Sequence, residues 1–179
     1  MYRKLDNSEL KRATLEEFRE SKKLPFVVVL DNVRSQHNIG SAFRSADAFA
    51  AEKVILCGIC ATPPSAEIRK TALGAEESVL WCYHPNTVDA VKELIEKGYR
   101  IVSIEQTDNS TSLELFKPKE GVKYALIFGN EVKGVAQEVI DMSDLTIEIP
   151  QFGSKHSLNV SVSVGVVLWE IAMAFKKHI

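Results

Sequence analysis

The chain reads Ala-Leu-Ile-Phe-Gly-Asn-Glu-Val-Lys-Gly-Val at residues 125–135 and Leu-Thr-Ile-Glu-Ile-Pro-Gln-Phe-Gly-Ser-Lys-His-Ser-Leu-Asn-Val-Ser-Val-Ser-Val-Gly-Val at residues 145–166. Two short apolar, β-branched runs, residues 124–128 and 145–149, lead into Gly-Asn and Pro-Gln. Such runs predict two buried strands, each followed by a loop. The second loop then leads into a long apolar helix.

Polar residues with no evident solvating role follow both predicted strands. Asn130 and Glu131 follow the first strand, and Ser157 and Asn159 follow the second. Open α/β sheets bind their ligands outside the carboxyl ends of the strands. These four residues therefore mark a candidate site.

Strands and helices alternate in the rest of the chain. Further strands are predicted at residues 26–30, 53–57, 79–83 and 100–104, and helices at residues 39–50, 66–73, 86–98 and 158–176. This alternation predicts an α/β fold with a mainly parallel sheet flanked by helices. The loops that carry Asn38, Glu105, Asn130 and Ser157 can then converge on one edge of the sheet.

A third motif, Asp-Asn-Val-Arg-Ser-Gln-His-Asn-Ile-Gly-Ser-Ala-Phe-Arg at residues 31–44, follows the first predicted strand. Asn38 falls at the expected start of the next helix, where Asn is a good N-cap. Capping and a role in the site are therefore both open for Asn38. Arg44 follows on the polar side of that helix, a position where an arginine is usually solvated.

Three segments resemble, in order, the motifs of the SpoU (TrmH-like) family of RNA ribose 2'-O-methyltransferases. They are residues 31–44, Phe-Gly-Asn-Glu at 128–131, and Ile-Pro with Ser-Leu-Asn-Val-Ser at 149–161. The family belongs to the SPOUT class of knotted, S-adenosylmethionine-dependent enzymes, and the resemblance runs from about Leu24 to the C-terminus. It implies a deep C-terminal trefoil knot at about residues 125–166, although chains generally avoid knots. It also implies a homodimer in which Arg44 completes the site of the other subunit.

The resemblance also implies roles for individual residues. Catalytic roles fall on Asn38, Arg44, Glu131, Ser157 and Asn159. The cofactor S-adenosylmethionine is expected to be held largely by backbone groups in the regions of Ile104, Glu105, Gln106, Phe128, Gly129, Ile149 and Leu158. No metal ion is expected.

Transfer of a methyl group to a ribose hydroxyl needs assistance, because this hydroxyl is a poor nucleophile at neutral pH. A guanidinium group stays protonated and is therefore a poor base. We accordingly favour for Arg44 a bidentate clamp on an RNA phosphate that also stabilises the developing alkoxide. Glu131 has a structural alternative, which is to fix its loop through hydrogen bonds to backbone amides.

Length and charge set further limits. The 179 residues predict a single main domain, at residues 25–179, with residues 1–24 as an N-terminal helical extension. The formal net charge is −2, whereas small nucleic-acid binders are often strongly basic. Any RNA-binding surface must therefore be a local patch. The candidates are two groups of basic residues, Arg3, Lys4, Lys11, Arg12, Arg19, Lys22 and Lys23 in one and Arg34, Arg44, Arg69 and Lys70 in the other. For the first group a solvated amphipathic helix is an equal alternative.

Other patterns argue against several protein classes. No Gly-x-Gly-x-x-Gly motif follows a strand, and the phosphate-loop spacing at residues 129–134 lacks its Lys, which disfavours dehydrogenases and P-loop enzymes. The odd number of cysteines, Cys57, Cys60 and Cys82, predicts buried or half-buried thiols instead of a disulfide framework. None of the four histidines is expected to bind a metal ion. The sequence shows no apolar signal core or membrane-spanning run, which predicts a cytoplasmic protein without a membrane partner.

The sequence therefore predicts a homodimeric RNA 2'-O-methyltransferase. Residues 158–176 are apolar nearly all round, which predicts that a second copy covers the side of this helix that the sheet leaves open. No separate RNA-binding domain precedes Pro25, and this compactness favours tRNA over rRNA as the substrate. An rRNA methyltransferase and a non-catalytic RNA-binding or ribosome-assembly module stay open as alternatives. An α/β enzyme that uses another nucleotide has only the fold class in its favour.

Overall fold

The computed structural model describes residues 2–10 and 12–176. The strands in this part of the chain are β1 (Leu24–Asp31), β2 (Ala51–Cys57), β3 (Trp81–His84), β4 (Tyr99–Ile104), β5 (Thr111–Ser112), β6 (Lys123–Phe128) and β7 (Leu145–Glu148). The α-helices are α1 (Leu15–Glu20), α2 (Gln36–Ala48), α3 (Ala66–Ala72), α4 (Ala75–Ser78), α5 (Thr87–Glu96), α6 (Gln137–Ile140) and α7 (Val160–Lys176). Two short 3-10 helices are η1 (Asn7–Leu10) and η2 (Leu113–Leu115).

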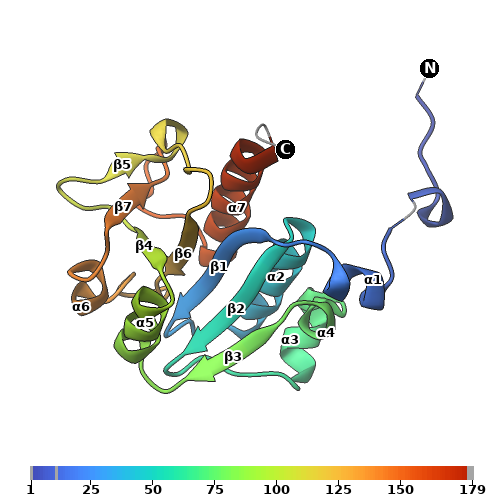
Figure 1. Cartoon of the computed structure of the whole chain (residues 1–179), viewed down its shortest axis with the longest axis horizontal. Coiled ribbons are helices and arrows are strands. Elements are labelled where there is room, and N and C mark those ends of the chain that lie inside the picture. The colour runs from blue at the N-terminus through green and yellow to red at the C-terminus, as the bar shows by residue number, and fades with distance from the viewer. Residues whose placement is uncertain (1, 11, 177–179) are drawn as a thin grey trace.

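The strands of the described chain pair in parallel in one sheet, in the order β3-β2-β1-β6-β4-β7-β5 (Figure 1). The predicted α/β fold with a parallel sheet flanked by helices is confirmed. From β1 the chain runs outward to β2 and β3, and then crosses to β4 on the far side of β6. The register pairs Leu30 and Ile104 with Phe128, so β1, β4 and β6 end at one level. Parallel sheets bind ligands beside such a reversal of strand order.

Each face of the sheet has its own apolar core, because successive strand residues point to opposite faces. On one face, Leu30 and Leu126 belong to a core that includes residues of α2 and α7. On the other face, Val29 and Ile127 belong to a core that includes residues of α5 and α6. The helices therefore cover both faces and leave the carboxyl ends of the strands free for loops.

The N-terminal segment lies at the edge of the molecule in Figure 1. Thr14 caps α1 and forms the predicted capping box with Glu17. α1 has no buried residue, and its Arg19 side chain donates a hydrogen bond to the backbone oxygen of Glu77 in α4. The division of the chain into an extension at residues 1–24 and a domain at residues 25–179 stays a prediction.

The structure corrects the expected start of α2. This helix begins at Gln36, three residues earlier than predicted, and its N-cap is Ser35, whose hydroxyl accepts a hydrogen bond from the Asn38 amide. Asn38 therefore lies inside the first turn and is not the cap. Its side chain is directed to another partner, which is described below.

α7 is buried on one side only. Val164, Leu168 and similar residues face the sheet, whereas Val162, Val166 and Trp169 are 49%, 38% and 55% exposed. The exposed three are spaced four and three residues apart and therefore share one face of the helix. The Trp169 ring also makes an edge contact with Phe49, which follows α2, at 6.1 Å between ring centroids. The chain itself therefore leaves this face of α7 exposed, and only a partner could cover it as predicted.

The trefoil knot at residues 125–166 stays a prediction. This segment contains β6, α6, β7 and the start of α7, and β4 lies between β6 and β7 in the sheet. In residues 2–10 and 12–176, no helix has the length and apolar character needed to cross a membrane.

Candidate cofactor cleft and active site

A cleft lies where β4, β6 and β7 end. Its volume is about 260 Å³, close to the lower end of the roughly 300–1,000 Å³ that small-molecule sites occupy. The lining residues include Ile104, Glu105, Gln106, Phe128, Gly129, Glu131, Ile149, Ser157 and Leu158. All seven residues predicted to hold the cofactor thus lie together at the expected edge of the sheet. Their role in binding stays a prediction.

A tight turn after β6 forms one wall of the cleft. Asn130 and Gly134 exchange two backbone hydrogen bonds, and the Asn130 side-chain oxygen accepts from the amides of Val132 and Lys133. Gly134 has a φ of 68°, in the left-handed region that favours glycine. A Cβ on Gly129 would lie 2.0 Å from the amide nitrogen of Val135, so the loop closes back directly on the strand end. Both glycines are therefore required by the shape of this wall.

Glu131 joins this turn to the loop after β1. Its carboxylate accepts hydrogen bonds from the backbone amides of Arg34 and Ser35, each at 3.2 Å, and from the Asn38 side chain at 2.9 Å. The structure thus contains the hydrogen bonds from backbone amides that we gave as an alternative, structural role for Glu131. It also gives Asn38 its partner, and two motifs 93 residues apart in sequence meet at one carboxylate.

The surroundings of Glu131 favour its charged form. Partial burial raises the pKa of this carboxyl group, but the hydrogen bonds from Asn38 and from the backbone amides outweigh that effect. The pKa of Glu131 is therefore lowered from 4.5, because hydrogen bonds donated to a carboxylate stabilise it relative to the protonated acid. At neutral pH the group is an anion that accepts hydrogen bonds and does not donate a proton.

A second carboxylate, Asp31 at the end of β1, is 1% exposed. One of its oxygens accepts from the Thr87 hydroxyl at 2.6 Å and from the Asn32 side chain at 2.9 Å, and the other accepts from the Ala136 amide at 2.9 Å. Asp31 therefore ties the starts of α5 and α6 to β1. The sequence pattern alone did not lead us to predict this role. An acidic residue that ends an apolar strand is the signal that could have pointed to it.

Glu105, at the end of β4, supports the same turn from the other side. Its carboxylate accepts from the Val135 amide at 3.1 Å and from the Gln106 amide at 2.9 Å. A Cβ on Gly134 would lie 2.0 Å from the Glu105 carboxylate, so the two are in close contact. Glu105 and Glu131 together place two carboxylates on the cleft lining.

The loop between β7 and α7 closes the cleft from a third direction. Ser157 lines the cleft, and the Gln106 side chain donates a hydrogen bond to the backbone oxygen of His156 at 3.2 Å. Asn159 is not part of the lining. Its side-chain oxygen accepts from the amide and the hydroxyl of Ser161, which fixes the first turn of α7.

Arg44 lies apart from the cleft. It is an exposed residue of α2 and lines a separate shallow hollow with residues of α3. Its side chain forms no hydrogen bond or ion pair with the described residues. The structure therefore brings Asn38, Glu131 and Ser157 close to the cleft of one chain, and it does not bring Arg44 to that cleft.

The cysteines form no reactive site. Cys57 and Cys60 are buried, as expected, and Cys82 is half-buried. Burial raises the pKa of the Cys57 thiol to about 12 and that of Cys60 to about 11, so neither is a thiolate at neutral pH. In the described part of the chain, no cluster of three or more His, Cys, Asp or Glu residues could hold a metal ion.

Comparison with known proteins places this geometry in a family. The model of the SpoU rRNA methylase family matches residues 25–169. A 23S rRNA (guanosine-2'-O-)-methyltransferase of Nitrosomonas europaea is 36% identical over 169 residues, covering 93% of this chain and 62% of that protein. A putative TrmH family tRNA/rRNA methyltransferase of Bacillus subtilis is 30% identical, covering 85% of this chain and 60% of that protein. The chain thus spans about three fifths of the length of the curated relatives that it matches.

Solved structures agree with the sequence comparison. The TrmH/SpoU tRNA modifying enzyme of A. aeolicus superimposes with a TM-score of 0.81 at 26% identity, covering 92% of this chain and 83% of that one. An AdoMet-bound rRNA methyltransferase of Sinorhizobium meliloti gives a TM-score of 0.79 at 27% identity, covering 90% of this chain and 60% of that one. On its motifs, its fold and these matches, the chain belongs to the SpoU rRNA methylase family.

Proposed function

We propose that this protein transfers the methyl group of S-adenosylmethionine to a ribose 2'-hydroxyl of RNA. The observation that carries the proposal is the cleft itself. Three loops at the carboxyl ends of β4, β6 and β7 form it, and the Glu131–Asn38 hydrogen bond joins it to the loop after β1. A structural relative, the rRNA methyltransferase of Sinorhizobium meliloti, is AdoMet-bound in its solved structure. Residues 25–179 are proposed as the catalytic domain.

The cleft suits an amphipathic, positively charged cofactor. Phe128, Ile149 and Leu158 supply apolar contacts, and Glu105 and Glu131 supply negative charge that complements a sulfonium ion. S-adenosylmethionine supplies the electrophilic methyl group when it is bound. The task of the protein is to hold that group and the ribose hydroxyl in line and to keep competing water away.

The residues around the cleft have separable tasks in this proposal. Glu131 and Asn38 hold the first and second motif loops together, so that the ribose meets a fixed wall. The Ser157 hydroxyl, on the cleft lining, orients the reacting nucleotide, and Asn159 holds the start of α7 behind it. Arg44 binds an RNA phosphate and stabilises the alkoxide that develops as the hydroxyl proton passes to solvent water.

A homodimer accounts for the position of Arg44. This residue does not line the cleft of its own chain, whereas Val162, Val166 and Trp169 form an exposed apolar strip on the neighbouring helix α7. Pairing of this strip with a second copy would bury it and would bring α2 of one subunit toward the cleft of the other. We therefore propose that each active site contains Arg44 of the partner subunit.

We propose rRNA as the substrate class, in place of the tRNA that the sequence analysis favours. The earlier preference depended on chain compactness alone. The curated relatives described above carry rRNA in their names, one of them beside tRNA, and the structural relatives include both a tRNA enzyme and an rRNA enzyme. The balance of these names favours rRNA.

Cofactor binding and methyl transfer test the proposal in two steps. S-adenosylhomocysteine at about 100 times its Kd should stabilise the protein by about 2.7 kcal/mol, which is roughly 5–10 °C in Tm for a chain of this size. Labelled S-adenosylmethionine should then label unmodified rRNA more than unmodified tRNA. No thermal shift would contradict the cofactor assignment. A thermal shift without transfer to either RNA would favour the non-catalytic RNA-binding module.

A further inference from the structure

A shallow hollow lies on the surface between α2 and α3, separate from the cofactor cleft. Ser41, Arg44, Ser45, Ala48, Phe49, Lys70 and Thr71 line it. The two helices approach closely, because a Cβ on Gly40 would lie only 2.2 Å from the backbone oxygen of Ile68. The Thr71 hydroxyl also donates a hydrogen bond to the backbone oxygen of His37 at 2.8 Å. The hollow is therefore built on a fixed helix pair.

The lining of the hollow suits an anion. It contains an arginine, a lysine and the hydroxyls of Ser41 and Ser45, and none of its described lining residues is acidic. Arg44 and Ser45 follow Ser41 by three and four residues on α2, so each is a neighbour of Ser41 on the helix surface. In a chain with a net charge of −2, this concentration of donors and positive charge is local.

The two cations of the hollow are held differently. Arg44 is exposed and makes no ion pair with the described residues, so its planar group is free for a bidentate contact. The Lys70 ammonium is 2.5 Å from Glu67, one turn earlier in α3, and the Lys70 side chain is 62% exposed. This pair orients the lysine without burying it, so its remaining donors stay accessible to an approaching anion.

We propose that the hollow binds a phosphodiester group of the RNA strand, with Lys70 as a second RNA-contacting cation beside Arg44. The inference rests on the proposed function, because it takes RNA to be the substrate. Arg44 contacts the phosphate through its fork, and Lys70 adds a point charge from α3. The hydroxyls of Ser41 and Ser45 donate to the remaining oxygens. The contact positions the strand and carries no base preference.

Salt dependence of RNA affinity separates a phosphate contact from a loss of fold. Each phosphate neutralised contributes about 0.7 to 0.9 to the slope of log K against log salt. Lys70→Ala should therefore lower rRNA affinity several-fold and reduce this slope by about one contact. Lys70→Arg should keep the slope. The measurement is fluorescence anisotropy with the full chain, saturating S-adenosylhomocysteine and labelled rRNA fragments, over 50 to 200 mM salt.

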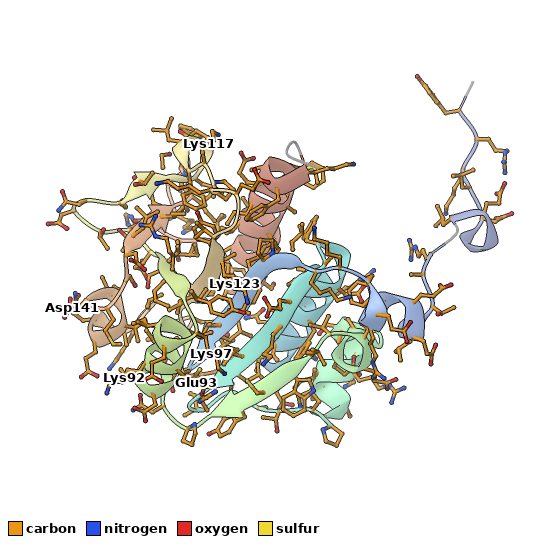
Figure 2. The ribbon with its side chains drawn as sticks, viewed as in Figure 1. Lys92, Glu93, Lys97, Lys117, Lys123 and Asp141 are labelled. Atoms are coloured by element: carbon orange, nitrogen blue, oxygen red, sulfur yellow. The ribbon has the colours of Figure 1, made fainter. Side chains whose placement is uncertain are left out.

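Lys92→Ala is the matched control. Lys92, which is labelled in Figure 2, lies on α5, and this helix packs on the opposite face of the sheet from α2. Like Lys70 it has an acidic partner three residues earlier, Asp89, and its side chain is 63% exposed. Its removal should leave both affinity and slope unchanged.

The outcomes are distinct. Equal slopes for wild type, Lys70→Ala and Lys92→Ala would overturn the inference, as would a change of oligomeric state in Lys70→Ala, which would make the hollow a contact between copies. If the wild type methylates RNA and the slopes are equal, only the Lys70 assignment fails. If the wild type binds RNA with a Lys70-dependent slope but transfers no methyl group, the proposed activity fails and the phosphate site stands.

Discussion

Glu131 joins two loops through a single carboxylate, and its contacts explain why an acidic residue is needed at this position. The carboxylate accepts from two backbone amides and from Asn38. A glutamine has only one acceptor oxygen, and its amide group would face donors. Sequence reasoning raised amide contacts for Glu131 as an alternative. It did not name Arg34 and Ser35, because those partners depend on how β1 and β6 pair.

Glu131→Gln should destabilise the protein in a pH-dependent way. The folded-state pKa of Glu131 is lowered from 4.5, so its contribution to stability is fully present above about pH 4.5 and is lost as pH falls through the folded pKa. We expect the variant to lose about 1 kcal/mol at pH 7, the net value of a typical hydrogen bond. This difference in unfolding free energy between variant and wild type should shrink as the pH falls below 4.5.

Urea unfolding at pH 7 and at pH 3.5 measures both quantities. Glu96→Gln is the control, since Glu96 is an exposed residue of α5 whose side chain forms no hydrogen bond or ion pair with the described residues. If the difference in unfolding free energy between wild type and Glu131→Gln were the same at both pH values, the hydrogen bonds to the Glu131 anion would not be the cause of the lost stability.

At the scale of elements, packing of α2 against α3 builds the hollow and positions Asn38. Gly40 makes this packing possible, because a Cβ there would lie 2.2 Å from both the Ile68 backbone oxygen and the Thr71 hydroxyl oxygen. Gly165, in the middle of α7, is different. A Cβ there would meet only the Ser45 hydroxyl oxygen, at an ordinary 3.8 Å.

Substitution by alanine should therefore lower the stability of the protein at Gly40 and raise it at Gly165. Gly40→Ala forces the helices apart and should cost about 1–3 kcal/mol, as overpacked cores do. Gly165→Ala should stabilise by up to about 1 kcal/mol, because alanine is the better helix former. Thermal and urea unfolding of both variants give the comparison. A stabilised Gly40→Ala variant would contradict the close approach of α2 and α3.

Most elements could be predicted from sequence, and the misses have physical reasons. The apolar runs of β1, β2, β4, β6 and β7 were found within two residues, because strands buried on both faces read as continuous apolar segments. α4 and β5 are four and two residues long, too short to show a period. The start of α2 was placed late, because its first turn, Gln-His-Asn, is polar and its cap is Ser35.

In the whole molecule, one side of α7 is left uncovered by the described part of the chain. Its exposed strip of Val162, Val166 and Trp169 lies beside α2, which carries Arg44. Val166→Glu should therefore yield a monomer at micromolar concentration by sedimentation velocity, since a charge is costly to bury in an apolar contact. Methyl transfer should be lost together with dimerisation, because Arg44 is proposed to act in the partner's site.

Ile95→Glu is the control for this substitution. Ile95 is also an exposed apolar residue of a helix. Its helix, α5, packs on the other face of the sheet from α7. Its substitution should leave the sedimentation coefficient unchanged. A wild-type protein that sediments as a monomer, or a Val166→Glu variant that sediments like wild type, would contradict the proposed dimer.

Strand order and chain path lie beyond sequence reasoning at this scale. The motifs predicted that Asn38, Glu105, Asn130 and Ser157 lie at one edge, because carboxyl ends of parallel strands share an edge. The motifs did not predict that Arg44 lies outside the cleft of its own chain, since its position depends on the direction that α2 takes after β1. Local patterns also carry no information on threading, so the knot follows only from the family resemblance.

The chemical identity of the product tests the proposed methyl transfer most directly. Unmodified rRNA is incubated with the protein and labelled S-adenosylmethionine, digested to nucleosides and analysed by mass spectrometry, with Asn38→Ala in parallel. We predict a labelled 2'-O-methylnucleoside that is strongly reduced in the variant, because Asn38 is the side-chain partner of Glu131 at the cleft. A label on a base, or no label despite bound cofactor, would contradict it.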